Sequence, residues 1–224
     1  MATLGFFSAF TPQNVTYLLG GLGITVGVSL ISVILSLIFG SIVGIIQFER
    51  IPYFSKFVGT INNVIRNLPL LLIIFFVYFA LPKIGIHLSV FWATIIAMST
   101  FESAMLAEIV RGGLESVDIG QFEGARANGL SNMQTMIYII LPQAYKKMIP
   151  PIISQLISLV KDTSLAMGIV LAELMYRGQI VYAQNSTYII PVLIVITLVY
   201  FVLNYGLSLV ARWADRKLAD RKST

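Results

Sequence analysis

The chain has 224 residues, of which 57% are hydrophobic and only 11% charged, and its mean hydropathy is +0.87. A soluble domain has about a quarter charged residues, so this composition excludes an ordinary soluble protein and indicates one membrane domain over residues 1–224. The net charge of +5 comes from basic residues scattered over loop ends, which argues against a nucleic-acid-binding face. Without cysteine and with one histidine, the sequence offers no disulfide, no predicted metal site and no predicted catalytic residue.

A helix needs about 20 residues to cross a bilayer, and five apolar stretches have lengths near or above this value. They predict an all-α integral membrane fold with spans at residues 17–47, 57–81, 88–110, 151–174 and 188–210. We expect the first stretch to remain in the mature protein, because no Lys or Arg precedes it and it contains no short apolar region with a small-residue cleavage site.

The basic residues predict the orientation of these spans. One side of the predicted membrane carries Arg50, Lys56, Arg111, Arg126, Lys146, Lys147, Arg212, Arg216, Lys217, Arg221 and Lys222. The other side carries Lys83 and Arg177. The positive-inside rule makes the first side cytoplasmic, so the N-terminus is expected outside and the C-terminus inside. His87 follows Lys83 in a loop and is expected to be solvated.

The first span carries small residues at four-residue spacing, namely Ser32, Ser36, Gly40 and Gly44. This spacing lays a smooth stripe along one helix face, which lets a second helix approach closely. The partner helix is expected within the same subunit, and a second subunit is the alternative.

A polar stretch at about residues 112–148 joins the third and fourth spans and predicts a short cytoplasmic helix. Asp118 is expected to cap its start, with Gln121 at the third position reaching back. Gly129 after Asn128 is expected to end it. This helix could lie on lipid headgroups or dock into a partner protein. Its acidic residues outnumber its basic ones, which favours docking, because a surface-lying helix is usually rich in Lys and Arg.

A second helix is predicted to begin at Ser131, with Gln134 completing a capping box. It is expected to end near Leu141, because Pro142 disfavours helical geometry in the residue before it. The prolines at 150 and 151 are expected to mark the start of the fourth span.

Four ionisable residues lie well inside the apolar spans, away from their ends, namely Arg66, Glu102, Lys161 and Asp162. Counting about 1.5 Å per residue from the cytoplasmic ends places each near the middle of a bilayer core of about 30 Å. Intramembrane charges are expensive, so they point to a functional site, and transporters hold their cargo at this depth. Two readings stay open: the four charges pair with one another, or they bind a zwitterionic cargo.

In the cargo reading, Arg66 binds a carboxylate, and Glu102 or Asp162 binds an ammonium. The neutral hydrogen-bonding partners are Asn62, Asn63 and Asn67. Glu108 lies nearer the cytoplasmic side. It is expected to form a salt bridge with Arg111 or a contact in a gate rather than to bind cargo.

The cytoplasmic stretch contains Glu123-Gly124-Ala125, then Gly129, then Ile139 and Leu141-Pro142. This pattern resembles the EAA loop of ABC import permeases, E-A-A, three residues, G, nine residues, I-x-L-P, and departs from it only at Gly124. The likeness extends to the polar amino acid uptake permeases of the histidine, glutamine and arginine type. Segments starting at Arg66, Ala107 and Lys161 resemble that family's R-G-T-P-L-L, A-E-x-x-R-G and K-x-T-S-L segments.

The resemblance implies a type I ABC importer permease in a prokaryotic inner membrane, with a coupling helix seated in an ATP-binding subunit. The coupling role passes to Asp118, Gln121, Glu123, Gly124, Ala125, Asn128 and Gly129. The implied partners are a second permease subunit, expected to be identical, two ATP-binding cassette subunits and an extracytoplasmic amino-acid-binding protein. ATP and Mg belong to the partner, and this chain has no P-loop motif and no cofactor of its own.

Glu102 departs from the family, which usually has a small or neutral residue there, and this acid favours a basic amino acid as cargo. The main alternative is an ion-driven carrier or channel without an ATPase, with the midplane charges as a relay. The docking helix argues against it. An intramembrane hydrolase lacks a nucleophile with its base and lacks a metal site.

Overall fold

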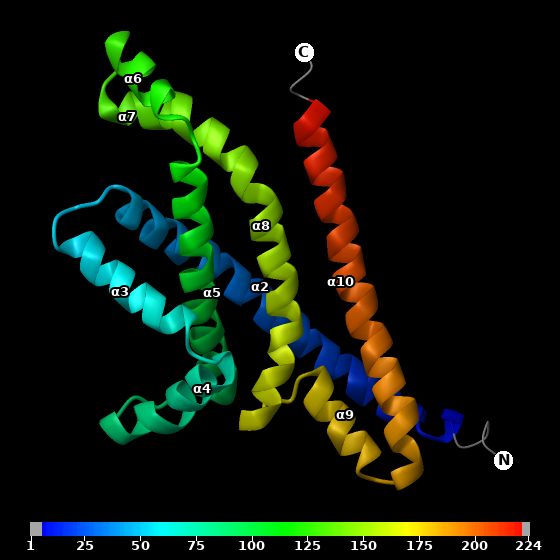
Figure 1. Cartoon of the computed structure of the whole chain (residues 1–224). Helices are drawn as coiled ribbons and strands as arrows, with labels where there is room; N and C mark the ends of the chain where they lie inside the picture. The colour runs from blue at the N-terminus through cyan, green and yellow to red at the C-terminus, as the bar shows by residue number, and fades with distance from the viewer. Residues whose placement is uncertain (1–5, 221–224) are drawn as a thin grey trace. The chain divides into compact units, whose positions relative to one another are not determined.

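The structure is a computed structural model that describes residues 6–220, with side chains from 6 to 212, so Arg221 and Lys222 lie outside it. Every regular element in the described part is helical (Figure 1). Four helical runs are long and apolar enough to cross a membrane: Pro12–Phe48, Val90–Glu115, Asn132–Ile169 and Ser186–Arg212. A fifth span would combine Phe54–Arg66 with Leu70–Ile84. The all-α membrane fold is therefore confirmed.

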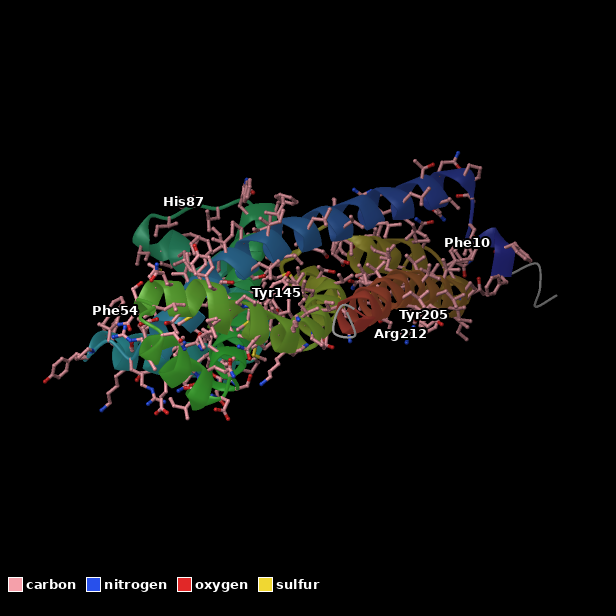
Figure 2. The ribbon with its side chains drawn as sticks, turned by 90° about the horizontal axis from the view of Figure 1, so that it is seen from above. Phe10, Phe54, His87, Tyr145, Tyr205 and Arg212 are labelled. Atoms are coloured by element: carbon pink, nitrogen blue, oxygen red, sulfur yellow. The ribbon has the colours of Figure 1, made fainter. Side chains whose placement is uncertain are left out.

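The elements follow one another with short connections. They are α2 (Pro12–Phe48), α3 (Phe54–Arg66), α4 (Leu70–Phe75), η1 (Phe76–Ala80), η2 (Leu81–Ile84), α5 (Val90–Glu115), α6 (Ile119–Ala127), α7 (Asn132–Thr135), η3 (Met136–Ile140), α8 (Leu141–Asp162), η4 (Thr163–Ile169), α9 (Leu174–Tyr182), η5 (Ser186–Tyr188) and α10 (Ile189–Asp220). His87 is exposed in the segment between η2 and α5, as expected (Figure 2).

The predicted second span, residues 57–81, is not one continuous helix. α3 ends at Arg66, and α4 begins at Leu70. Pro69 between them is extended, with φ −61° and ψ 128°, and it has no N–H to continue the helical hydrogen bonds. The interruption places Arg66 at a helix end rather than in the middle of a helix.

The predicted end of a helix near Leu141 is wrong. Helical structure continues from α7 through the π-helical turn η3 into α8, with Pro142 in the first turn of α8. The wider π turn makes room for a proline ring that would otherwise clash with the carbonyl four residues earlier. Pro150 and Pro151 likewise lie inside α8 and do not start the fourth span.

The chain divides into two compact units, and each of the four long runs contributes residues to both. Unit 1 contains residues 1–34, 68–99 and 157–207, and unit 2 contains residues 35–67, 100–156 and 208–224.

The core of unit 1 forms where the first turns of α2 meet α9 and the start of α10. Its buried residues are Ala9, Leu18, Leu174, Val181, Val192 and Ile196. Gly178 permits the close packing of α9, because a Cβ there would lie 2.0 Å from the Ile196 side chain.

The core of unit 2 joins the end of α5 to the start of α8. Its buried residues are Val110, Leu114, Val117, Ile140, Ala144 and Met148. A Cβ on Gly40 would lie 2.9 Å from the Ser103 carbonyl oxygen, and one on Gly44 would lie 2.6 Å from the Ala107 carbonyl oxygen. These two glycines therefore let α2 pack against α5, which confirms the expected packing within the subunit.

Candidate functional site

The predicted coupling helix is α6 in unit 2. Asp118 caps it, because its Oδ1 accepts a hydrogen bond of 2.7 Å from the Gly120 N–H. The expected return contact from Gln121 is absent, and its Oε1 instead accepts from Gln143 Nε2 at 3.2 Å. The predicted return contact was wrong because Gln143 on α8, which lies outside the local pattern, binds the Gln121 side chain. The coupling role of Gln121 stays a prediction.

The end of α6 is a glycine cap. Gly129 has φ +83°, and its N–H donates to the Arg126 carbonyl at 3.0 Å. The Leu130 N–H donates to the Ala125 carbonyl at 3.2 Å, so the two bonds form a Schellman motif. Asn128 adds a side-chain bond to the Gly124 carbonyl. The predicted stop at Asn128-Gly129 is therefore confirmed.

α7 and the free face of α6 complete this segment. Ser131 and Gln134 form the predicted capping box. Ala125 is buried, whereas Glu123 and Gly124 are exposed and no atom lies within 4 Å of a Cβ built on Gly124. One face of α6 is therefore packed against the protein, while the opposite face is open.

An ion-pair chain in unit 2 joins α3 to the last turns of α5. Glu108 binds Arg66 through Oε2 at 3.0 Å and binds Arg111 through both of its oxygens. Arg111 continues to Glu115 at 2.6 Å, and Arg50 lies 3.7 Å from Glu115. The Glu108–Arg111 bridge was predicted. The bond to Arg66 was not, and it holds the end of α3 against α5.

Glu102 and the asparagines of α3 lie in different environments. Glu102 is fully buried on α5, and its Oε1 accepts a hydrogen bond of 3.3 Å from Gln155 Nε2 on α8. Asn62 is buried and donates to the Ala104 carbonyl at 3.2 Å. Asn63 is exposed. In unit 2, therefore, Glu102 and Asn62 bond helices together, while Asn63 remains open to a ligand.

Lys161 and Asp162 lie in unit 1, where α8 changes into the 3-10 helix η4. Lys161 is exposed and forms no ion pair within the described residues, and Asp162 is half-buried. The Ser164 hydroxyl donates to the Lys161 carbonyl at 2.8 Å and satisfies the backbone at this change. The lysine ammonium is thus left accessible.

Glu173, which was not predicted as a site residue, is fully buried in unit 1. It caps α9 by accepting from the N–H groups of Met175 and Tyr176 at 2.8 and 2.7 Å. The Tyr200 hydroxyl donates to it at 2.9 Å. The available signal was an acidic residue one position before the end of the predicted fourth span.

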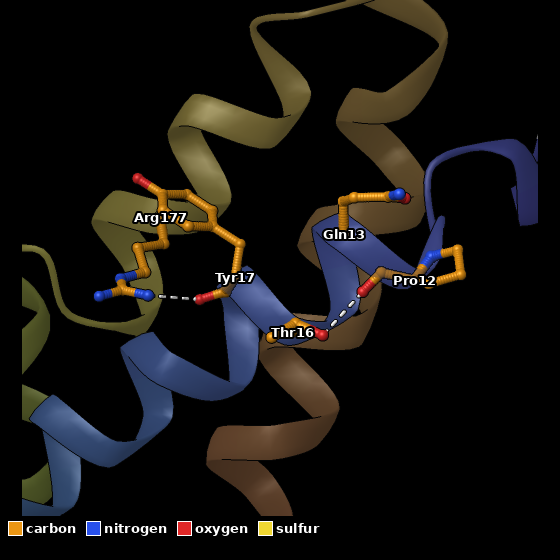
Figure 3. Close-up of a pocket in the computed structure, with 5 residues that line it drawn as sticks. All are labelled: Pro12, Gln13, Thr16, Tyr17 and Arg177. Atoms are coloured by element: carbon orange, nitrogen blue, oxygen red, sulfur yellow. Dashed lines mark hydrogen bonds between the residues drawn. The ribbon is translucent and has the colours of Figure 1, made fainter.

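A cavity of about 560 Å³ lies in unit 1 between the start of α2 and α9 (Figure 3). Arg177 lines it and donates to the Tyr17 carbonyl at 2.8 Å and to the Ala172 carbonyl at 2.9 Å. Its guanidinium carbon lies 4.7 Å from the centre of the Tyr17 ring. These backbone and ring contacts fix the Arg177 side chain, which links α9 to the start of α2.

The model of the family described as binding-protein-dependent transport system inner membrane component matches residues 36–220. The chain belongs to this family. It is therefore a multi-pass inner-membrane subunit of an ABC importer for amino acids, and separate ATPase subunits hydrolyse the ATP.

Individual relatives support this assignment. The permease is 48% identical over 211 residues to the probable glutamine ABC transporter permease protein GlnP of Bacillus subtilis (strain 168), covering 93% of this chain and 97% of that one. It is 34% identical to the arginine transport system permease protein ArtQ of the same organism, covering 95% and 96%. A crystal structure of an amino acid ABC transporter with histidines superimposes with a TM-score of 0.85 at 27% identity, covering 92% and 95%.

Proposed function

We propose that this permease pairs with a second permease subunit to form the pathway of an ATP-driven importer for polar amino acids, with glutamine as its cargo. Two ATP-binding subunits and an extracytoplasmic binding protein complete the importer, and ATP and Mg bind to the ATP-binding subunits. Cargo crosses by alternating access, because closure of the ATPase dimer moves the coupling helices.

The observation that carries the proposal is α6, a short helix with its own caps and one open face on a member of this family. Both ends of α6 are closed by bonds formed inside the segment and Ala125 is packed against the rest of unit 2, so the helix is formed before an ATPase subunit binds. The exposed Glu123 and Gly124 then offer a preformed surface to an ATPase groove. An ion-driven carrier has no use for such a surface.

Burial of Glu102 favours glutamine over a basic cargo. This carboxylate is fully buried and bonded to Gln155, so it is engaged by the protein rather than offered to an incoming cation. The 48% identical relative bears a glutamine name. Basic amino acids are the second candidate, and two observations support them: the acid at Glu102 itself and the arginine permease among the relatives.

For the zwitterionic part of the cargo we propose Lys161 and Asp162 as the main contacts. Lys161 has an accessible ammonium for a carboxylate, and Asp162 is the half-buried acid beside it. In unit 2 we propose separate cargo contacts at Asn63, which is exposed, and at Arg66. Arg66 binds Glu108, so it offers cargo the remaining donors of its guanidinium.

Reconstitution into liposomes tests the energy source. The permease, purified with its ATPase partner and supplied with its binding protein, is expected to take up labelled glutamine only when ATP reaches the ATPase side. Collapsing ion gradients with ionophores should leave uptake unchanged. Uptake driven by an ion gradient without ATP would reject the proposal and favour an ion-coupled carrier.

The same vesicles test the cargo. Asp162→Asn is expected to lower substrate-stimulated ATPase activity about tenfold, since a charged hydrogen bond to cargo is lost. Glu102→Gln is expected to change glutamine uptake by less than about threefold, because an amide still bonds to Gln155. A tenfold loss of arginine uptake in Glu102→Gln, with arginine preferred over glutamine in the unmodified protein, would instead establish the basic cargo.

The second permease subunit is proposed to be another copy of this chain. The alternative is a different permease, because Bacillus subtilis also has a probable glutamine permease named GlnM that is 40% identical over 69% of this chain. Co-expression of two differently tagged copies decides between them. Joint purification supports the homodimer, and separation of the tags contradicts it.

A further inference from the structure

A second cavity lies in unit 2 at the turn between α2 and α3, apart from the residues proposed for cargo and coupling. It measures about 490 Å³ and is lined by this turn and by the end of α5. Its lining includes Arg50, Tyr53, Ser55, Lys56, Arg111 and Glu115. A volume of this size accommodates a small polar group.

The lining carries three cations and one carboxylate. Glu115 neutralises Arg111 at 2.6 Å and lies 3.7 Å from Arg50. Arg50 is 82% exposed, and Lys56 forms no ion pair in the part of the chain that the structure describes. Glu49 precedes Arg50 but is not among the residues that line the cavity. The cavity therefore has a surplus of two positive charges at its mouth.

The apolar side chains around the cavity suggest a location at the lipid headgroups. Ile51 and Tyr53 line the cavity and are 46% and 93% exposed. Phe54 and Phe57 follow them in α3 outside the lining and are at least half exposed. Figure 2 labels Phe54. Exposed aromatics at the end of a membrane span settle where hydrocarbon meets water. Arg50 and Lys56 belong to the basic side of the spans, which the positive-inside rule makes cytoplasmic.

We propose that this cavity binds the phosphate of an anionic glycerophospholipid of the cytoplasmic leaflet. Arg50 and Lys56 pair with the phosphate, while Ile51, Phe54 and Phe57 contact the acyl chains. A basic pocket between spans on the cytoplasmic side is the arrangement that recognises anionic headgroups. The apolar rim favours a lipid over a soluble phosphate, because a soluble anion gains nothing from it.

Lipid retention during purification tests the proposal. The permease, purified with its partner subunits in detergent, is incubated with equal amounts of phosphatidylglycerol and phosphatidylcholine, and bound lipid is counted by native mass spectrometry. We expect a preference for phosphatidylglycerol of at least about fivefold, the effect of one cation near an anionic surface. The double variant Arg50→Gln, Lys56→Gln should lose this preference.

A matched control separates a site from general charge attraction. Lys146→Gln with Lys147→Gln removes the same charge from exposed positions on α8 and should change phosphatidylglycerol retention by less than about twofold. Lys56→Arg should retain the lipid. Equal losses in both double variants, or no loss in the first, would overturn the proposal. Displacement of the lipid by an excess of inorganic phosphate would also overturn it, in favour of a soluble anion.

Discussion

The proposed coupling segment and the ion-pair chain both lie in unit 2, and they hold their polar groups in opposite ways. The backbone groups at the two ends of α6 are satisfied locally, by Asp118 at one end and by the Gly129 cap at the other. In the ion-pair chain, Glu108 joins an arginine of its own helix to Arg66, which is forty-two residues away in the sequence. The first is a local structure and the second is a long-range one.

This difference predicts that one region contributes to partner binding and the other to the stability of the fold. A helix whose ends are capped locally needs no bonds from its exposed face, so that face is free to bind a partner. A carboxylate shared between two helices fixes those helices against each other, so its loss should disturb the fold before it disturbs any partner. Variants in the two regions should therefore fail in different assays.

The largest expected effect comes from Glu108→Gln. It leaves Arg66 and Arg111 without their carboxylate, and because these side chains are about 30% exposed we expect a loss of about 2 kcal/mol in the free energy of unfolding. Titration with sodium dodecyl sulfate in mixed micelles measures this quantity. Glu123→Gln, exposed on α6, should stay within about 0.5 kcal/mol. Equal stability of the two variants would remove the distinction between the regions.

Glycines of α2 give the next effect. Gly44→Ala would place a Cβ 2.6 Å from the Ala107 carbonyl oxygen, and the forced separation of α2 from α5 should cost about 1–2 kcal/mol of unfolding free energy. Gly27→Ala on the same helix meets no atom within 4 Å and should cost nothing. The same detergent titration compares them. Similar values for both would mean that the close approach of the helices is unimportant for stability.

The smallest effect is expected within the coupling segment itself. Gly129→Ala forces a Cβ into φ +83° and should destabilise the end of α6 by about 1 kcal/mol, which hydrogen exchange of the α6 amides reports. Gly124→Ala meets open space and raises helix propensity, so it should increase protection by a similar amount. The two variants should change the hydrogen-exchange protection of the α6 amides in opposite directions. A gain of protection in Gly129→Ala would contradict the glycine cap.

Local patterns predicted the elements whose causes are local. The cap at Asp118, the stop at Gly129 and the capping box of Ser131 with Gln134 depend on residues within three or four positions of each other. The proline rule wrongly predicted a helix end near Leu141, because a π-helical turn just before Pro142 lets the helix continue. The predicted contact from the Gln121 side chain back to the start of α6 was also wrong, since its partner Gln143 comes from another helix.

Charged residues show the same division. Sequence placed Arg66, Glu102 and Glu108 in apolar helices and paired Glu108 with Arg111 at helical spacing. It could not show that Glu108 also binds Arg66, because that bond depends on how α3 packs against α5. Glu173 was not predicted as a cap although its bonds to the start of α9 are local. Its further bond from Tyr200 on α10 depends on the tertiary structure.

The sequence by itself determined that this chain is a membrane protein, which stretches are apolar helices and where the short cytoplasmic helix α6 begins and ends, because hydropathy and capping act over short stretches. Only the tertiary structure decided which charges pair, which glycines carry helix contacts and where a basic cavity opens beside α3. Those features arise from distances between helices, which depend on the packing of the whole side-chain set rather than on any one stretch of it.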